Sequence, residues 1–191
     1  MNIEQLKYVS KMQMTDNLQT KINATTDCLK EISYRFKSLP PVITWHTQYD
    51  KVLHRYEFLI LDGPTKIGKT EFAKSFSVEG RRMVVNCKRC PEPPLQDFRS
   101  GVHDLLILDE AMPDMIAGNR KLMQASNDWV ELGTSRTNCM VYKVHMHRVK
   151  IIITANGFWN DLQDIDADSR AWILGNSTYV RLGKEPLYMQ T

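Results

Sequence analysis

The sequence predicts an α/β fold in which helices cover a mostly parallel central sheet. Short apolar runs that end in glycine or acidic residues recur along the chain, as in FLILDG at 58–63 and LLILDE at 105–110. Segments with helical spacing of apolar residues lie between these runs, a pattern that favours a parallel sheet covered on both faces. Of the 191 residues, 42% are apolar, which is ordinary for one packed globular domain.

Overall charge and hydropathy narrow the class of protein. The net charge of +3 neither demands nor excludes a nucleic-acid partner, so any basic patch must be local. No apolar run approaches the ~20 residues needed to span a bilayer. The first residues, MNIEQLKYVSKMQ, lack the apolar core of a secretory signal. We therefore expect an intracellular location and reduced thiols at the four cysteines, Cys28, Cys87, Cys90 and Cys139.

Residues 1–38 are predicted to be helical, and Pro40 and Pro41 are expected to end this segment. Side chains that are apolar except for Thr25 follow in steps of four and three, which places them on one helix face; they are Leu18, Ile22, Thr25, Leu29, Ile32 and Phe36. This stripe can pack against the shorter segment that precedes it or against a neighbouring subunit, and both alternatives remain open. The predicted domains are 1–40 and 41–191.

The later elements follow in chain order. A helical segment carrying Trp45, Tyr49, Val52 and Leu53 comes first. The predicted strands lie within 56–63, 81–87, 103–111 and 148–157, with helices at 69–76 and near 117–126. Two β segments within 127–148 are predicted to join through a polar turn at 133–138.

The stretch GPTKIGKT matches the phosphate-loop pattern G-x-x-x-x-G-K-[ST]. Its residues are Gly63, Pro64, Thr65, Lys66, Ile67, Gly68, Lys69 and Thr70. It follows a predicted strand and precedes a predicted helix, the context in which free backbone N–H groups can face an anion. We expect Lys69 to reach the β- and γ-phosphates of ATP and Thr70 to offer its hydroxyl to Mg²⁺.

The run LLILDE supplies two carboxylates after four apolar residues, as a Walker B strand does. We expect Asp109 to meet the Mg²⁺ water shell and Glu110 to orient and deprotonate the attacking water. The alternative is a buried strand that ends in an exposed acidic turn. The phosphate loop some forty residues earlier favours the first interpretation.

A further apolar run, IIITAN, ends in Asn156. Its amide can hydrogen-bond the attacking water or the γ-phosphate, and Thr154 is a weaker candidate for the same role. The alternative is an asparagine that closes the strand as a turn residue. Because open parallel sheets bind ligands at the carboxyl ends of their strands, the three strand ends together predict ATP binding and hydrolysis.

This order of motifs, with a β-rich insert before the strand that ends in asparagine, resembles the superfamily 3 helicases. They occur in the replication initiator (Rep) proteins of circular single-stranded DNA viruses and related elements. The resemblance covers roughly residues 56–160. It implies an AAA+-like P-loop NTPase fold, a DNA helicase or translocase, and a ring, usually a hexamer, with ATP between subunits. It also implies that residues 1–40 are an oligomerisation segment. The implied location is the host nucleus for a eukaryotic virus and the cytoplasm otherwise.

The insert 127–148 resembles the hairpin that grips single-stranded DNA in the ring channel. Its candidate DNA-binding residues are Arg136, Lys143, His145, His147 and Arg148, with Tyr142 between them. Cationic and aromatic side chains together suit charge neutralisation and base stacking. The alternative is a solvated hairpin face.

The ring that the resemblance implies also needs an arginine that reaches a neighbour's ATP. Arg170, in DADSRAW, is the first candidate for this finger and Arg181 a weaker one. The alternative is an ordinary surface arginine.

Two short motifs depart from the pattern of those initiators. The metal-binding H-x-H and the Y-x-x-K nucleophile of their endonuclease domain have counterparts at 145–147 and 34–37, but in reversed order. We therefore expect any endonuclease to lie on a domain or subunit outside this chain. The C-x-x-C pair at 87–90 has no second pair to complete a zinc site and is expected to lie in a loop.

Three other functions compete with the helicase. A P-loop ATPase could act as a nucleotide-dependent switch or assembly protein without unwinding DNA. A small-molecule kinase would need an acceptor pocket and an arginine-bearing lid, and no clear lid is present in the sequence. A purely oligomeric module would leave Lys69, Asp109 and Glu110 without a role.

Overall fold

A five-stranded sheet organises the part of the chain described by this computed structural model, residues 35–133 and 141–189. The strand order is β2-β3-β6-β1-β7, and every neighbouring pair in the sheet is parallel. The strands are β1 (Phe58–Asp62), β2 (Arg82–Asn86), β3 (Leu105–Asp109), β6 (Lys150–Ala155) and β7 (Ser177–Arg181). The predicted parallel α/β architecture is therefore confirmed.

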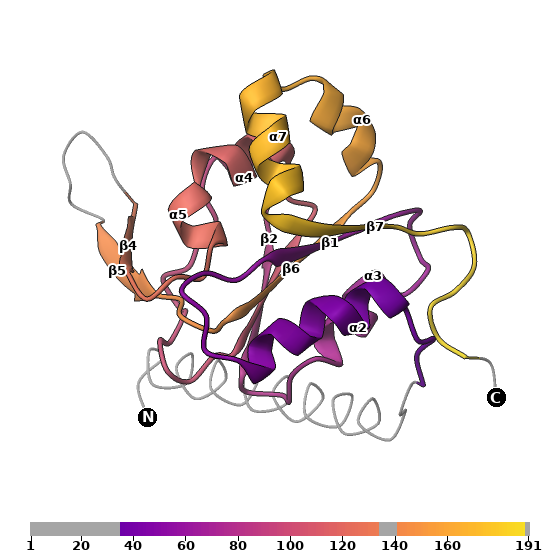
Figure 1. Cartoon of the computed structure of the whole chain (residues 1–191), viewed down its shortest axis with the longest axis horizontal. Helices are drawn as coiled ribbons and strands as arrows, with labels where there is room; N and C mark the ends of the chain where they lie inside the picture. Colours follow the sequence, from indigo (N-terminus) through magenta and orange to yellow (C-terminus); the bar gives the residue numbers. More distant parts are fainter. Residues whose placement is uncertain (1–34, 134–140, 190–191) are drawn as a thin grey trace, which may run out of the picture. The chain divides into compact units, whose positions relative to one another are not determined.

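Helices lie on both faces of the sheet (Figure 1). On one face are α2 (Pro40–Thr47), followed by the 3-10 turn η1 (Gln48–Asp50), and α3 (Lys69–Lys74). On the other are α4 (Pro113–Gly118), α5 (Arg120–Met123), α6 (Phe158–Gln163) and α7 (Ala167–Gly175). Within residues 35–133 and 141–189, no helix is long and apolar enough to cross a membrane.

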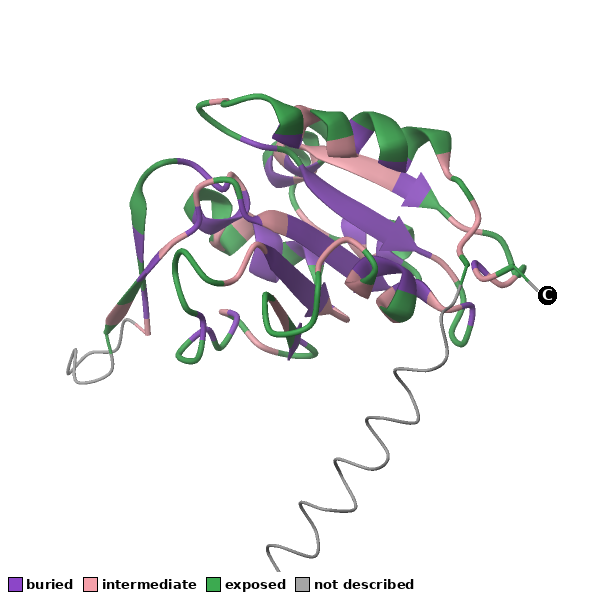
Figure 2. Ribbon diagram, turned by 90° about the horizontal axis from the view of Figure 1, so that it is seen from below, coloured by how far each residue is buried: buried purple, intermediate pink, exposed green. Residues whose placement is uncertain are grey.

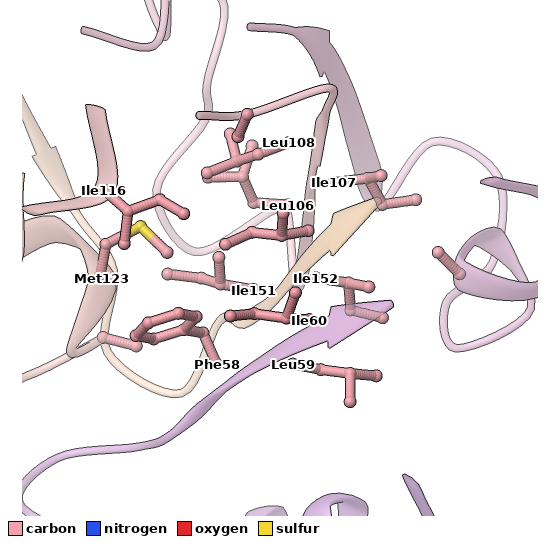
Figure 3. Close-up of a cluster of buried hydrophobic side chains, with 14 of the residues drawn as sticks. Phe58, Leu59, Ile60, Leu106, Ile107, Leu108, Ile116, Met123, Ile151 and Ile152 are labelled. Atoms are coloured by element: carbon pink, nitrogen blue, oxygen red, sulfur yellow. The ribbon is translucent and has the colours of Figure 1, made fainter. Parts of the chain in front are cut away.

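The core is built on the three central strands, whose side chains are buried on both faces (Figure 2). This double burial explains why their sequences are continuous apolar runs rather than alternating ones. Figure 3 shows Ile116 of α4 and Met123 of α5 against the strand residues. The labelled strand residues are Phe58, Leu59, Ile60, Leu106, Ile107, Leu108, Ile151 and Ile152, each at most 1% exposed.

The insert forms a separate antiparallel hairpin of β4 (Trp129–Leu132) and β5 (Tyr142–His145). Val130, Leu132 and Val144 are buried, whereas Trp129, Glu131 and Lys143 are exposed. The two predicted β segments are confirmed, and most of their connecting turn lies outside the described residues.

The helix predicted for residues 1–38 falls almost entirely outside the described residues, and for 35–38 the prediction is wrong. Phe36 forms an antiparallel bridge with Tyr188, and the N–H of Lys37 donates to the carbonyl of Leu187 at 2.7 Å. This pairing requires extended backbone and overrides the local helical spacing. The compact unit that contains the sheet begins at Phe36, within the predicted helix.

Other predicted boundaries also change. Pro40 and Pro41 begin α2 instead of ending a helix, since proline suits the first helical turn. The helical segment ends with η1, which leaves Val52 outside it and 75% exposed. The helix expected near 117–126 is replaced by α4 and α5, which are separated at Asn119. The sequence interpretation did not include α6, α7 or β7.

The central strands should dominate the stability of the fold. Ile153 on β6 is fully buried and lies between Ile60 and Leu108 in the sheet register. We expect Ile153→Ala to lower the free energy of unfolding by about 2–5 kcal/mol, because it leaves a cavity that packed neighbours cannot fill. Val84→Ala, at a 42% exposed position on β2, should cost less than about 1 kcal/mol. Urea denaturation of both variants checks this; equal losses would contradict it.

Candidate active site

The sheet register brings the predicted site residues to one edge. Asp62 at the end of β1 lies opposite Ala155 of β6, and Asp109 at the end of β3 lies opposite Thr154. Because β6 runs between β1 and β3, its end stands between the glycine-rich loop and the acidic pair. Asn156 follows directly, so the three predicted strand ends do converge.

The loop between β1 and α3 is shaped by two glycines. A Cβ on Gly63 would lie 2.8 Å from the Cβ of Leu182, so no other residue fits without displacement. Gly68 has φ +90°, a left-handed conformation that side chains disfavour. The loop is also held from outside, because the N–H of Leu187 donates to the carbonyl of Ile67 at 2.8 Å.

Lys69 is the first residue of α3 and only 8% exposed. Its Nζ donates to the carbonyls of Gly63 at 2.8 Å and Pro64 at 2.7 Å, and to Oδ1 of Asn156 at 2.8 Å. All three N–H donors of the ammonium group therefore have acceptors. Burial lowers the pKa of Lys69, while Asp62, Asp109 and Glu110 oppose this effect.

Asp109 is joined to two hydroxyl groups. Thr70 Oγ1 donates to its Oδ1 at 3.3 Å, and Thr154 Oγ1 donates to the same oxygen. A hydroxyl and a carboxylate oxygen at this position are hard donors of the kind that Mg²⁺ prefers. Thr70 and Asp109, the predicted metal ligands, thus fit the ion.

Glu110 occupies a strained turn just beyond β3, with φ +55° and its N–H donating to the carbonyl of Thr154 at 2.7 Å. Its Oε1 accepts from Nδ2 of Asn156 at 3.2 Å, and its Oε2 lies 3.3 Å from Nζ of Lys88. Asn156 therefore joins Lys69 to Glu110 through the two ends of one amide. Left-handed backbone at a non-glycine residue is uncommon and is found disproportionately at functional sites.

These groups surround a cavity of about 300 Å³. It is lined by Thr65, Lys66, Gly68, Lys69, Thr70, Glu71, Asp109, Glu110, Thr154 and Asn156. A second cavity of about 200 Å³ includes the other side of Glu110, with Lys88 and Asp161 in its wall. A larger cavity of about 410 Å³ lies between the hairpin and Gly118–Leu122 and contains none of the phosphate-loop or acidic residues.

The predicted DNA-binding residues divide into two groups. Lys143, on the exposed hairpin face, is paired with Glu131 at 2.9 Å. His145 lies beside Trp129, with ring centroids 5.3 Å apart, and its Nε2 is 3.0 Å from Oδ1 of Asn127. Tyr142 instead turns to the body of the domain, where its hydroxyl accepts from the N–H of Leu95 at 2.9 Å.

His147 and Arg148 lie at the base of the hairpin. His147 Nε2 is 3.3 Å from the carbonyl of Leu53, and Arg148 donates to the carbonyl of Tyr49 at 2.8 Å. These contacts anchor the hairpin to the η1 region. Arg136 lies outside the described residues.

The two arginine-finger candidates occupy different places. Arg170 on α7 is half-buried, does not line the cavity around Lys69, and donates to Oε1 of Gln163 at 3.1 Å. Arg181 ends the edge strand β7, exposed and opposite Asp62 in the register. A role of either arginine at a neighbour's site stays a prediction.

The cysteine pair lies in the loop that follows β2, as predicted. Cys87 is buried, and burial raises the pKa of its thiol to about 12. Among residues 35–133 and 141–189, no three His, Cys, Asp or Glu side chains are grouped to hold a metal ion.

Sequence reasoning missed Asp62 and Lys88. An acidic residue at the end of a fully apolar strand, immediately before the glycine loop, was a usable signal for Asp62. Lys88 carries no such signal, since its approach to Glu110 depends on the path of the loop after β2.

Similarity to known proteins is found at the level of solved structures. No protein-family model and no curated protein matches the chain. NtrX from Brucella abortus in complex with ATP is 16% identical, with a TM-score of 0.45 over 96% of this chain and 46% of that one. NtrX from the same bacterium in complex with ADP is 14% identical, with a TM-score of 0.44 over 96% and 45%. The chain thus spans less than half the length of these NtrX chains.

The parallel sheet, the loop that leads from β1 into α3 and the side chains at the neighbouring strand ends define an α/β P-loop NTPase fold.

The close approach at Gly63 can be tested directly. We expect Gly63→Ala to lower the free energy of unfolding by about 1–3 kcal/mol, because the added methyl must displace Leu182. Gly175, the last residue of α7, has no atom within 4 Å of an added Cβ. Gly175→Ala should therefore leave stability unchanged or raise it by up to about 1 kcal/mol. Denaturant titration compares them, and a neutral Gly63→Ala would refute the crowding.

Proposed function

We propose that this protein binds and hydrolyses ATP in the cavity around Lys69. The observation that carries the proposal is the hydrogen-bonded series Lys69–Asn156–Glu110, which joins a phosphate-loop lysine to a carboxylate across the cavity. Such an arrangement places a cation for phosphate and a base for water a short distance apart, as phosphoryl transfer to water requires.

Phosphate binding would use groups that hydrogen-bond to each other in this structure. Lys69 donates to two loop carbonyls and to Asn156, and phosphate oxygens can replace some of these acceptors. The incoming negative charge favours the ammonium form that burial disfavours. Thr70 and Asp109 would hold Mg²⁺, which neutralises charge on the phosphates.

Glu110 would act as the general base. Each carboxylate oxygen has two lone pairs, so Oε1 can accept from Asn156 and from a water together. Glu110 takes a proton from this water, whose oxygen bonds to the γ-phosphorus. The bond from that phosphorus to the bridging oxygen breaks, and its electron pair leaves with ADP. The Asn156 amide, which bonds to both Lys69 and Glu110, would hold the two side chains in place during this proton transfer.

Two substitutions separate binding from turnover. We expect Lys69→Ala to weaken ATP binding and reduce hydrolysis to background, because it removes the buried cation. Glu110→Gln should change ATP affinity less than about threefold and lower kcat by about 10²–10⁴-fold, because the amide cannot accept a proton. Lys74→Ala is the matched control, since Lys74 lies on α3 but pairs with Glu71 at 2.7 Å.

Phosphate-release assays and nucleotide titration measure both quantities. Retained turnover in Glu110→Gln would remove Glu110 as the base. Absence of hydrolysis by the unaltered protein, at concentrations that allow oligomers to form, would contradict the proposed activity itself.

At a finer level, we propose a superfamily 3 helicase domain of the viral replication-initiator type. The support is the exposed hairpin, with Lys143 and His145 on its outer face beside Trp129. Single-stranded DNA is the proposed partner, held by phosphate charge and base stacking. A homo-oligomeric ring, hexameric by resemblance, would bring Arg170 to a neighbour's ATP. The side chain of Arg170 donates to the neutral amide of Gln163, and among the described residues no carboxylate forms an ion pair with it.

The competing proposal is a P-loop ATPase that acts as a switch or assembly protein without unwinding DNA. The observation that favours it is the ion pair between Lys143 and Glu131, which reduces the positive charge of the hairpin face. The two proposals differ in whether DNA stimulates hydrolysis.

DNA binding by the hairpin gives a graded prediction. Lys143→Ala should weaken binding of single-stranded DNA and lower the slope of log affinity against log salt by about 0.7, the share of one phosphate contact. Glu131→Gln should strengthen binding, because it frees Lys143 from its partner. Lys184→Ala, an exposed lysine far from the hairpin in sequence, is the control. Fluorescence anisotropy at several salt concentrations measures the slope; identical slopes in all variants would favour the switch or assembly protein.

A further inference from the structure

A buried carboxylate outside the predicted set lies at the end of β1. Asp62 is 4% exposed and accepts four hydrogen bonds. Its Oδ1 accepts from the N–H groups of Gly157 at 2.9 Å and Phe158 at 3.0 Å. Its Oδ2 accepts from the N–H of Trp159 at 3.1 Å and the hydroxyl of Tyr179 at 2.6 Å. The charge is therefore fully coordinated by donors from two other parts of the chain.

Three of these donors are consecutive backbone N–H groups at the start of α6. The turn that leads into this helix passes through Gly157 in the left-handed region, with φ +80°. No residue of the turn itself caps the helix with a side chain. The carboxylate from β1 takes over that function, so it ties the first residues of α6 to the end of β1.

The residues on either side of these contacts belong to the proposed active site. Asn156 immediately precedes Gly157, and Gly63 immediately follows Asp62. Gly63 supplies a carbonyl to Lys69, and Asn156 supplies its amide to both Lys69 and Glu110. Asp62 thus fixes the backbone next to Gly63 and next to Asn156, both of which bond to Lys69.

We propose that Asp62 is a positioning residue for ATP hydrolysis, which holds the Asn156 amide between Lys69 and Glu110. This inference rests on the proposed ATPase function. Asp62 lines neither of the cavities around Glu110, so it acts through the backbone rather than by touching ATP. A misplacement of about 1 Å at such a site can reduce the rate about 10²-fold.

A double-mutant cycle tests the proposal. Asp62→Asn keeps the shape but replaces one acceptor oxygen with a donor that faces backbone N–H or the Tyr179 hydroxyl. We expect kcat to fall by about 10–100-fold, with KM changed less than about threefold. In an Asn156→Ala background, Asp62→Asn should lower kcat by less than about threefold further, because the group that it positions is already absent.

Two further variants guard against a general folding effect. Asp166→Asn removes the charge of a comparable helix-capping carboxylate, since Asp166 Oδ1 accepts from the N–H of Ser169 on α7 at 2.8 Å; its kcat should remain normal. Tyr179→Phe removes one donor to Asp62 and leaves the charge. It should lower kcat a few-fold and lose this effect when combined with Asn156→Ala, so it serves if Asp62→Asn does not fold.

Hydrogen–deuterium exchange gives a readout independent of catalysis. Peptides that cover residues 156–163 should exchange faster in Asp62→Asn than in the unaltered protein, without nucleotide present. The positioning role would be overturned if the exchange rates did not change. It would also be overturned if the fold-decreases in kcat of Asp62→Asn and Asn156→Ala simply multiplied in the double variant. In both cases, normal hydrolysis by the unaltered protein would leave the ATPase proposal intact. Absence of hydrolysis in the unaltered protein would overturn the ATPase, and a role in hydrolysis with it.

Discussion

The arrangement of the site depends on one buried ammonium group. Lys69 cannot leave water unless acceptors replace the hydrogen bonds that it loses. The loop therefore turns so that the carbonyls of Gly63 and Pro64 face inward, and Asn156 completes the set. Carboxylates on two strands offset the remaining desolvation. The loop conformation, the amide orientation and the nearby carboxylates thus all compensate for the desolvation of the Lys69 ammonium group.

The strand order allows these groups to meet around Lys69. Because β6 separates β1 from β3, its last residues can contact both the loop and the acidic pair. Thr154 donates to Asp109 and its carbonyl accepts from the N–H of Glu110, while Asn156 reaches Lys69. A sheet with β1 and β3 adjacent would lack this intermediary. The proposed division of labour between phosphate binding and water activation therefore follows from topology as much as from residue identity.

Local pattern was sufficient to predict the central strands and the residues that converge at their ends. Their continuous apolar runs and the glycine-rich loop are properties of short stretches of sequence. Long-range contacts account for what was not predicted. β7 is half-buried and weakly apolar, and it is fixed by pairing with β1. Phe36 and Lys37 are not helical because they pair with Tyr188 and Leu187. Asp62 accepts from backbone N–H groups 95 to 97 residues away. His147 and Arg148 contact carbonyls in and near η1 that are 94 and 99 residues away.

The contacts that residues 177–188 make with the phosphate loop and β1 also affect the order in which the protein folds. Leu187 bonds to Ile67, and β7 pairs with the strand that leads into the loop, although about 120 residues separate the partners. During synthesis on the ribosome, the loop and β1 emerge long before these residues exist. Such distant pairings form late and slowly in folding. The nascent protein therefore has the loop sequence without its finished shape, and we expect the proposed binding of ATP only after residues 177–188 have been translated.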